Sequence, residues 1–400
     1  MNLIVKIKTL VSICLICLGF NPYLNAQEQD NLLMGADQPE VYLPLLKDKK
    51  VIVLTNQTGV ISDQNHTHIV DFLLSKGVNI QKIFTPEHGF RGDADAGEKV
   101  NSQIDSKTGL PIVSLYGDNK KPTPQQLGDA DIILFDVQDV GVRFYTYIST
   151  LTYLLEAAGE NNKEVIVLDR PNPHDGYTDG PILNKKWASF VGMHPVPIIY
   201  GLTIGEYGKM VIGEKWLKNG VQPKYKVIKM ANYHKKNRYH IAISPSPNLP
   251  NDQSINLYPS LCFFEGTNIS LGRGTDFPFQ VFGSPYLKNY KFKFTPQPSY
   301  GSKNPPLNGI LCYGEDLRNY SESLTTLNLE WLLEAYKNYK SPKGKDDFFS
   351  KNLFFDKLAG TDQLRKQIIR GWSEKEIKDS WKSGLIEFEK IRTKYVIYPD

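Results

Sequence analysis

The amino-acid sequence predicts an α/β protein: a Rossmann-like parallel sheet domain joined to a second, smaller α/β domain. Short runs of β-branched residues alternate with helical patterns from residue 51 to about residue 230, which is typical of a parallel sheet wrapped by helices. Two of these runs, Ile132–Phe135 and Val165–Leu168, are apolar throughout, as expected of strands buried on both faces. A proline-rich stretch at 244–250 then interrupts the alternation, because proline has a fixed φ and no backbone N–H. We therefore expect the sheet domain over residues 27–250 and the smaller domain over residues 251–400.

The expected elements follow from the apolar runs and their spacing. The predicted strands are Val51–Thr55, Ile80–Thr85, Ile112–Leu115, Ile132–Asp136, Val165–Asp169 and Val196–Tyr200. Helices fit an apolar stripe at residues 69–74, which Gly77 ends, and the segments Ser149–Glu160, Ile204–Leu217, Leu324–Tyr339 and Asp362–Arg370. A capping-box pattern, Ser373 with Glu376, begins a last helix, and a strand is expected at Tyr395–Tyr398.

The first 26 residues have the pattern of a secretory leader. Lys6 and Lys8 precede the apolar run Leu10–Phe20, and the small residue Ala26 follows. The run is short for a membrane span, so an uncleaved anchor is the less favoured alternative. We expect a cleaved signal peptide over residues 1–26, a periplasmic or extracellular protein, and no stable membrane insertion.

Charge and cysteine content exclude several classes of protein. The formal net charge is only +4, which gives no electrostatic case for a nucleic-acid-binding protein. Two of the four cysteines lie in the expected leader. The remaining pair, Cys262 and Cys312, could form a disulfide, but nothing in the sequence requires one.

Polar side chains follow four of the predicted strands, at the point where each strand ends. Ligands of open parallel sheets bind outside the carboxyl ends of the strands, so these side chains are candidate site residues. Carboxylates, arginines, amides and tyrosines together suit a polyhydroxylated ligand such as a sugar, whose hydroxyls need fixed donors and acceptors. The four groups are Asn56–Gly59, Pro86–Gly92, Asp136–Tyr147 and Asp169–Pro173.

Common cofactor and nucleophile motifs do not occur in the sequence. No Gly-x-Gly-x-x-Gly follows the first strand, and no phosphate-binding Gly-Lys-Ser/Thr loop is found. His66 and His68 have no third metal ligand nearby, and Gly-x-Ser-x-Gly does not occur. We therefore expect neither a cofactor nor a metal ion.

Several of these stretches resemble one family, the bacterial exo-β-N-acetylmuramidases, which release N-acetylmuramic acid from the non-reducing ends of peptidoglycan fragments. The resemblance runs from about Gly59 to Tyr398. It implies a Rossmann-like domain and a smaller α/β domain with the site in the cleft between them, no nucleotide, and a catalytic glutamate at Glu87. The stretches that carry it are Glu87–Gly92, Asp136–Tyr147, Asp169–Pro173, Gly201–Glu206, Glu265–Asn268 and Gly272–Thr275.

Glycoside hydrolysis needs an acid and usually a second carboxylate. Glu87 can be the general acid if its surroundings raise its pKa, whereas an ion pair with Arg91, four residues on, would make it structural. For the second carboxylate we favour Asp139. Asp136 and Asp169 are further candidates, but each could equally cap a turn. Glu206 is another, although helix capping is its favoured role. Glu265 and the N-acetyl group of the substrate itself complete the set of candidates.

The lactyl carboxylate of muramic acid calls for a guanidinium partner. Each candidate arginine could equally brace a loop through backbone carbonyls, and the candidates are Arg91, Arg143, Arg170 and Arg273. Further contacts to the sugar are expected from His88, Gln138, Tyr145, Asn172 and Glu265. Tyr145 and Tyr147 alternate with Phe144, so at most one face of this stretch meets the cleft. The expected partner is a peptidoglycan-derived glycan or muropeptide. The main alternative is a periplasmic binding protein that captures the same sugar without cleaving it.

Overall fold

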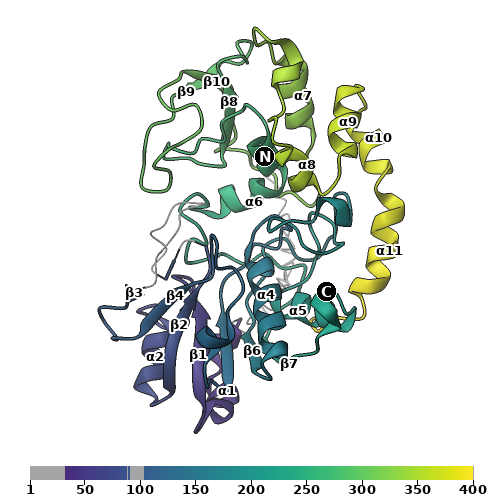
Figure 1. Cartoon of the computed structure of the whole chain (residues 1–400). Helices are drawn as coiled ribbons and strands as arrows, with labels where there is room; N and C mark the ends of the chain where they lie inside the picture. The colour runs from purple at the N-terminus through teal and green to yellow at the C-terminus, as the bar shows by residue number, and fades with distance from the viewer. Residues whose placement is uncertain (1–31, 88, 91–102, 400) are drawn as a thin grey trace, which may run out of the picture. The chain divides into compact units, whose positions relative to one another are not determined.

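The large sheet has the strand order of a Rossmann fold, extended by one short strand at its edge. The computed structural model describes residues 32–87, 89–90 and 103–399. Seven strands are hydrogen-bonded in the order β3-β4-β2-β1-β5-β6-β7, and all neighbours are parallel except β3 and β4 (Figure 1). The strands are β1 (Lys50–Thr55), β2 (Asn79–Thr85), β3 (Gln103–Ile104), β4 (Pro111–Ser114), β5 (Ile132–Asp136), β6 (Glu164–Leu168) and β7 (Lys224–Ile228).

The strand order reverses between β1 and β5, which pair in register from Val51 with Ile132 to Thr55 with Asp136. Chain connections run outward in opposite directions from this pair, because β2 and β4 lie on one side and β6 and β7 on the other. Such a reversal leaves a crevice outside the carboxyl ends of the strands, where ligands of these folds bind. The polar loops predicted from the sequence therefore meet at this edge of the sheet.

Alternate residues of the strands pack against different helices. Val51 and Val53 share a buried cluster with residues of α1 (Pro39–Leu46) and α2 (Ile69–Ser75). Ile52 and Leu54 point to the opposite face, where they join a cluster with residues of α4 (Tyr147–Glu160) and α5 (Ile204–Gly213). This two-residue alternation buries both faces of the sheet, as the continuously apolar strands predict. A short helix, α3 (Pro124–Leu127), precedes β5.

The second part of the chain is built around a small antiparallel sheet in the order β8-β10-β9. Its strands are β8 (Val281–Ser284), β9 (Phe292–Phe294) and β10 (Cys312–Asp316). The helices are α6 (Asp252–Leu261), α7 (Glu330–Asn338), α8 (Phe354–Ala359), α9 (Gln363–Ile369), α10 (Glu374–Asp379) and α11 (Lys382–Arg392). Short 3-10 helices lie at Gly35–Asp37, Lys185–Trp187, Lys218–Gly220, Cys262–Gly266 and Gly344–Asp347.

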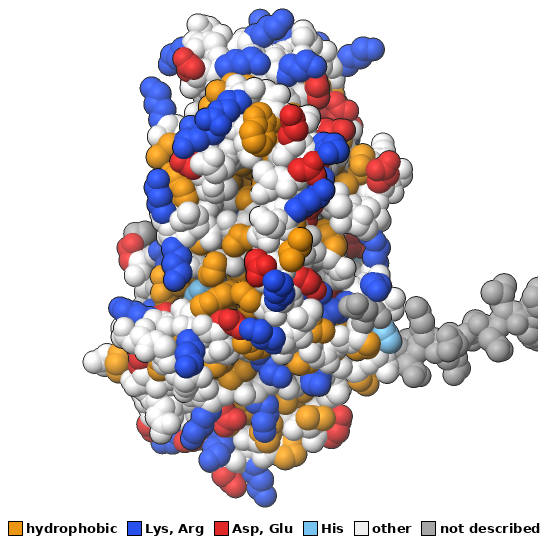
Figure 2. Space-filling model, turned by 90° about the vertical axis from the view of Figure 1, so that its right-hand side faces the viewer, with side chains coloured by type: hydrophobic (Ala, Val, Ile, Leu, Met, Phe, Trp, Pro, Cys, Tyr) orange, Lys and Arg blue, Asp and Glu red, His pale blue; other side chains and the backbone are white. Residues whose placement is uncertain are grey.

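The two parts share one apolar core. Phe144, which follows β5, makes edge-to-face contacts with Tyr258 and Phe263 of the second part. The chain then returns through α11, and its end lies beside α5 of the first part (Figure 1). On the face shown in Figure 2, basic and acidic side chains are interspersed, in agreement with the small net charge.

Most predicted elements are confirmed, but three expectations were wrong. Val196–Tyr200 is buried but forms only isolated bridges, from Ile199 to Val142 and to Asp179, because Pro195 and Pro197 cannot donate to a ladder. The expected strand at Tyr395–Tyr398 is irregular. The last predicted helix is two helices, α10 and α11, although the capping box of Ser373 and Glu376 is confirmed.

Two further findings bear on the sequence analysis. Cys262 and Cys312 are buried and are not joined by a disulfide. Over the described residues, no helix is long and apolar enough to cross a membrane. The expected signal peptide at 1–26 lies outside the described residues.

Candidate active site

Glu87 lies in the loop directly after β2 and is half-buried. Its Oε2 accepts a 2.7 Å hydrogen bond from the hydroxyl of Thr146, the residue before α4. Tyr116, two residues beyond β4, lies close enough to Glu87 for the charge of that carboxylate to raise the pKa of the tyrosine. The carboxylate that the sequence singled out therefore accepts a hydrogen bond from the loop after β5 and has a tyrosine from the end of β4 nearby.

The second part of the chain contributes an acidic and a basic side chain near the same place. Glu265 lies in the 3-10 helix Cys262–Gly266, and its Oε1 accepts hydrogen bonds from Arg273 at 3.0 Å from Nε and 2.5 Å from Nη2. Burial raises the pKa of Tyr116, and the charges of Glu87 and then Glu265 raise it further. Tyr116 thus lies within electrostatic range of both glutamates, one from each part of the chain.

Asp139 follows β5 and is buried. Its Oδ2 accepts hydrogen bonds from the Tyr200 hydroxyl at 2.5 Å and from the Gly141 amide at 2.8 Å. Its Oδ1 has no hydrogen-bond partner within the part of the chain that the structure describes. Burial raises the pKa of Asp139 to about 6, against the opposing effect of these hydrogen bonds.

Tyr145 and Tyr147 do not lie on a strand, so the expected alternation with Phe144 does not apply. Both hydroxyls donate to the backbone carbonyl of Pro245, at 2.8 and 3.0 Å. The amide of Asn56 in turn donates to the Tyr147 hydroxyl at 2.8 Å. These contacts fix the proline-rich stretch against the loops after β1 and β5.

Two of the arginines predicted to bind the lactyl carboxylate form their hydrogen bonds to groups of the protein itself. Arg170 donates from Nε and Nη2 to both oxygens of Asp136, at 2.6 and 3.0 Å, and from Nη2 to the carbonyl of Val60 at 2.8 Å. Arg143 is fully buried and donates to the carbonyls of Pro181, Val196 and Leu358. Burial lowers the pKa of Arg143 to about 9. The structure thus shows, for both side chains, the bracing contacts that were the alternative to binding a ligand carboxylate.

Asn172 also has a structural place. Its Nδ2 donates to the Leu202 carbonyl at 2.9 Å, and its Oδ1 accepts from the His174 amide at 2.8 Å. Gly141 packs so closely on this side chain that an added Cβ would lie 1.8 Å from Oδ1, and its φ of +71° favours glycine. Asn172 therefore supports the loop after β5 by packing against Gly141.

Two acidic candidates hold the end of the chain. Asp169 accepts hydrogen bonds from the hydroxyls of Thr203 at 2.7 Å and Tyr398 at 2.6 Å. Glu206 forms the predicted capping box with Thr203, and its carboxylate also accepts from the Lys235 ammonium and the Ile397 amide. Neither side chain contacts Glu87 among the hydrogen bonds of the described residues.

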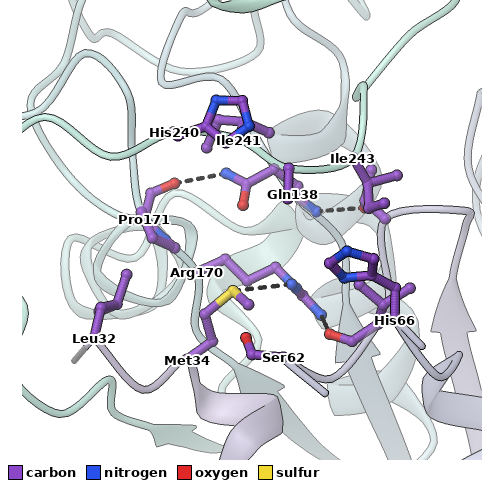
Figure 3. A pocket seen from close by; sticks show the side chains of 13 residues that line it. Leu32, Met34, Ser62, His66, Gln138, Arg170, Pro171, His240, Ile241 and Ile243 are labelled. Carbon is purple, nitrogen blue, oxygen red and sulfur yellow. Dashed lines mark hydrogen bonds between the residues drawn. The ribbon is translucent and has the colours of Figure 1, made fainter. Parts of the chain in front are cut away.

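A small pocket lies at the strand reversal, beside the loops after β1, β5 and β6 (Figure 3). Its volume is about 190 Å³. Gln138 lines it and donates from Nε2 to the carbonyls of Asp139 and Pro171, and Arg170 lines it with Nη1 3.2 Å from the Met34 sulfur. The remaining walls are mostly apolar, from Leu32, Val60, Ile241 and Ile243.

Several buried polar atoms near the carboxyl ends of neighbouring strands have no hydrogen-bond partner among the described residues. Buried polar atoms are normally hydrogen-bonded, so each exception needs an explanation. Four such atoms belong to residues at or just after the ends of β4, β2, β1 and β5, which are consecutive in the sheet. Such atoms suit ordered waters or the hydroxyls of a ligand. The atoms are Ser114 Oγ, Thr85 Oγ1, Gln57 Oε1 and Asp139 Oδ1.

Thr146, which bonds to Glu87, and Tyr116, which lies near it, are not among the predicted site residues, although both follow predicted strands. Thr146 was inside a quoted stretch, and Tyr116 directly follows the predicted strand Ile112–Leu115, which was the available signal. His88 and Arg91 lie outside the described residues. Among the described residues, no group of three or more His, Cys, Asp or Glu side chains could hold a metal ion.

Comparison with known proteins gives a consistent result. The family models for the N-terminal and C-terminal parts of "Exo-beta-N-acetylmuramidase NamZ" match residues 51–253 and 256–398. The chain is 39% identical over 378 residues to the peptidoglycan β-N-acetylmuramidase NamZ of Bacillus subtilis strain 168, and the match covers 89% of each chain.

Two crystal structures of DUF1343 family proteins from Bacteroides fragilis NCTC 9343 have the same fold. One is 42% identical with a TM-score of 0.83, and the match covers 92% of this chain and 99% of that one. The other is 30% identical with a TM-score of 0.76 and has the same coverage. The Rossmann-like strand order, the two-part architecture and the sequence matches agree, and the chain therefore belongs to the NamZ family of exo-β-N-acetylmuramidases.

Proposed function

We propose that this protein is an exo-acting glycoside hydrolase that removes N-acetylmuramic acid from the non-reducing ends of peptidoglycan fragments. The 39% identity to a peptidoglycan β-N-acetylmuramidase over 89% of both chains supports the reaction and the substrate class. The observation that carries the assignment of the acid is the half-buried carboxylate of Glu87, at the carboxyl edge of the sheet and hydrogen-bonded to the Thr146 hydroxyl.

Glu87 is the proposed general acid. It follows β2, next to the reversal point of the sheet, and its carboxylate is within hydrogen-bond reach of neighbouring loops. Cleavage of the glycosidic bond requires a proton on the leaving oxygen, and a carboxyl group at the mouth of such a crevice can supply it.

For the second carboxylate, the contacts favour Glu265 over Asp139. The side chain of Glu265 is 24% exposed, whereas Asp139 is 5% exposed and has one oxygen engaged by Tyr200 and Gly141. A group that acts on the sugar or on a water must reach it directly. We therefore propose that Glu265 acts on the substrate and that Asp139 is a buried support for the loop after β5.

Arg273 is the proposed partner of the lactyl carboxylate. Its side chain is 18% exposed, compared with 3% for Arg170 and none for Arg143. It stacks on the Phe279 ring with 4.9 Å between the guanidinium carbon and the ring centre, and it is paired with Glu265. A planar guanidinium held in this way can present its free edge to a ligand carboxylate.

Two chromogenic substrates test the proposal. The purified protein is incubated with a β-N-acetylmuramide and with the corresponding glucosaminide, which lacks the lactyl group. We expect turnover of the muramide and much slower turnover of the glucosaminide. Equal turnover of both would contradict the lactyl assignment, and calorimetric binding of an intact muramide without turnover would instead support a binding protein.

Export is a further proposal, which rests on the leader pattern at residues 1–26. Expression of the full chain followed by cell fractionation and N-terminal sequencing tests it. A mature protein outside the cytoplasm that begins near residue 27 is expected. Retention of the intact chain in the cytoplasm would contradict it.

A further inference from the structure

The hydroxyl of Thr146, at the start of α4, is directed to Glu87 and not to the first turn of the helix. The backbone of Thr146 is itself helical, with φ of −78° and ψ of −1°, and its side chain makes no capping hydrogen bond. A threonine caps a helix from an extended backbone, so the hydroxyl of Thr146 is available to another acceptor. It donates to Glu87 Oε2 at 2.7 Å, in surroundings that leave Thr146 only 7% exposed.

Other helices of the same chain provide a comparison. Thr203 and Thr123 precede α5 and α3 with extended backbones, at ψ of 165° and 160°, and each accepts from the backbone amide three residues on in a full capping box. The helical backbone of Thr146 does not place its hydroxyl for such a cap, and the hydroxyl contacts Glu87.

Tyr116 approaches the same carboxylate from a different element. It follows β4, and its ring packs on Phe190 with 5.9 Å between the ring centres. Burial first, and then the charges of Glu87 and Glu265, raise the pKa of Tyr116, so its hydroxyl stays protonated at neutral pH. Thr146 and Tyr116 thus present neutral hydroxyls to one carboxylate from two separately supported positions.

We propose that Thr146 and Tyr116 are positioning residues that fix the carboxylate of Glu87 in its working orientation. This inference rests on the proposed function of Glu87 as general acid. Thr146 holds Oε2, so the rotation of the carboxyl group is restricted before substrate binds. Proton transfer in the transition state depends steeply on such placement, because small displacements of a catalytic group cost large factors in rate.

Thr146→Val and Tyr116→Phe test the inference, because each removes a hydroxyl with little change in shape. We expect kcat on the muramide to fall about tenfold or more in each, with a smaller change in KM. Thr146→Ser keeps the hydroxyl and should restore the wild-type kcat. Thr152→Val removes a buried hydroxyl of the same helix, which bonds to the Ile148 carbonyl and to the His194 ring, and it should leave kcat unchanged.

A double variant separates positioning from a general loss of structure. In a Glu87→Gln background, Thr146→Val should cause little further loss of activity, because both residues act through one group. An equal fall in both backgrounds, or a wild-type kcat in Thr146→Val and Tyr116→Phe, would overturn the inference. Failure of the proposed function looks different: the wild-type protein itself would not cleave the muramide.

Discussion

The hydroxyl of Tyr398 donates a 2.6 Å hydrogen bond to Oδ2 of Asp169, across 229 residues of sequence. Asp169 directly follows β6, so this contact ties the end of the chain to the carboxyl edge of the large sheet. The neighbouring amide of Ile397 donates to Glu206, and the Lys235 amide donates to the carbonyl of Pro399. The last residues thus fasten the second part of the chain to the first.

Loss of the Tyr398 hydroxyl should destabilise the protein. Tyr398→Phe removes one donor from the buried Asp169 carboxylate, and we expect the free energy of unfolding to fall by about 1–3 kcal/mol in urea titrations. Tyr395→Phe is the matched control, because its hydroxyl bonds to the more exposed Glu214 and should contribute less. Equal stability of Tyr398→Phe and the wild type would contradict the role given to this contact.

Lys235 should be intolerant of substitution unless its partner changes too. Its buried ammonium lies 2.6 Å from Glu206 and 2.9 Å from Asp175. Lys235→Met leaves these carboxylates without their cation, so unfolding should become easier by about 3–5 kcal/mol.

The double variant Lys235→Met, Glu206→Gln should recover part of that loss, because it leaves one buried charge fewer. A thermodynamic cycle from chemical denaturation measures the coupling. Additive losses in the double variant would show that the two side chains do not act as a pair.

The raised pKa of Asp139 predicts that the free energy of unfolding decreases as pH rises. Burial raises its folded-state pKa from 3.8 to about 6, so the folded protein holds this proton more tightly than the unfolded chain. The contribution is fully present below about pH 4 and is lost as pH rises through about 6, a change of about 3 kcal/mol.

Asp139→Asn should therefore flatten the stability curve between about pH 4 and pH 7, measured by denaturation at several pH values. The exposed Asp48→Asn is a suitable control and should keep the wild-type slope. A wild-type slope in Asp139→Asn would show that another group sets this part of the curve.

Arg143 and Arg273 should respond differently to conservative change. Arg143→Lys cannot reproduce the fork that reaches the carbonyls of Pro181, Val196 and Leu358, and we expect a stability loss of about 2–3 kcal/mol. The folded variant should still prefer the muramide over the glucosaminide. Arg273→Lys should lose that preference with a smaller loss of stability; the reverse pattern in kinetic and unfolding measurements would contradict the lactyl assignment.

The strand ends could be predicted from sequence, because apolar runs and the polar residues after them are local features. Glu87, Asp139 and Arg170 all lie at the predicted edge of the sheet. The partners of these side chains could not be predicted in the same way. Arg143 meets a carbonyl 215 residues away, and whether it binds a ligand or braces a loop depends on that distant contact.

Glu206 makes one contact that can be predicted from the sequence and one that cannot. Its capping box with Thr203 spans three positions and is readable from the sequence. Its contact with the Ile397 amide spans 191 residues and depends on the path of the whole second part. Tyr116 was missed for a related reason: its role follows from the pairing of β4 with β2, which places the ends of the two strands side by side.

The most direct test of the account compares wild type and Glu87→Gln on a peptidoglycan fragment with a terminal N-acetylmuramic acid, with products identified by mass spectrometry. We expect the wild type to release free N-acetylmuramic acid, and the variant, with unchanged unfolding behaviour, to release it at least about 100-fold more slowly. Release at the wild-type rate by Glu87→Gln would contradict the central assignment.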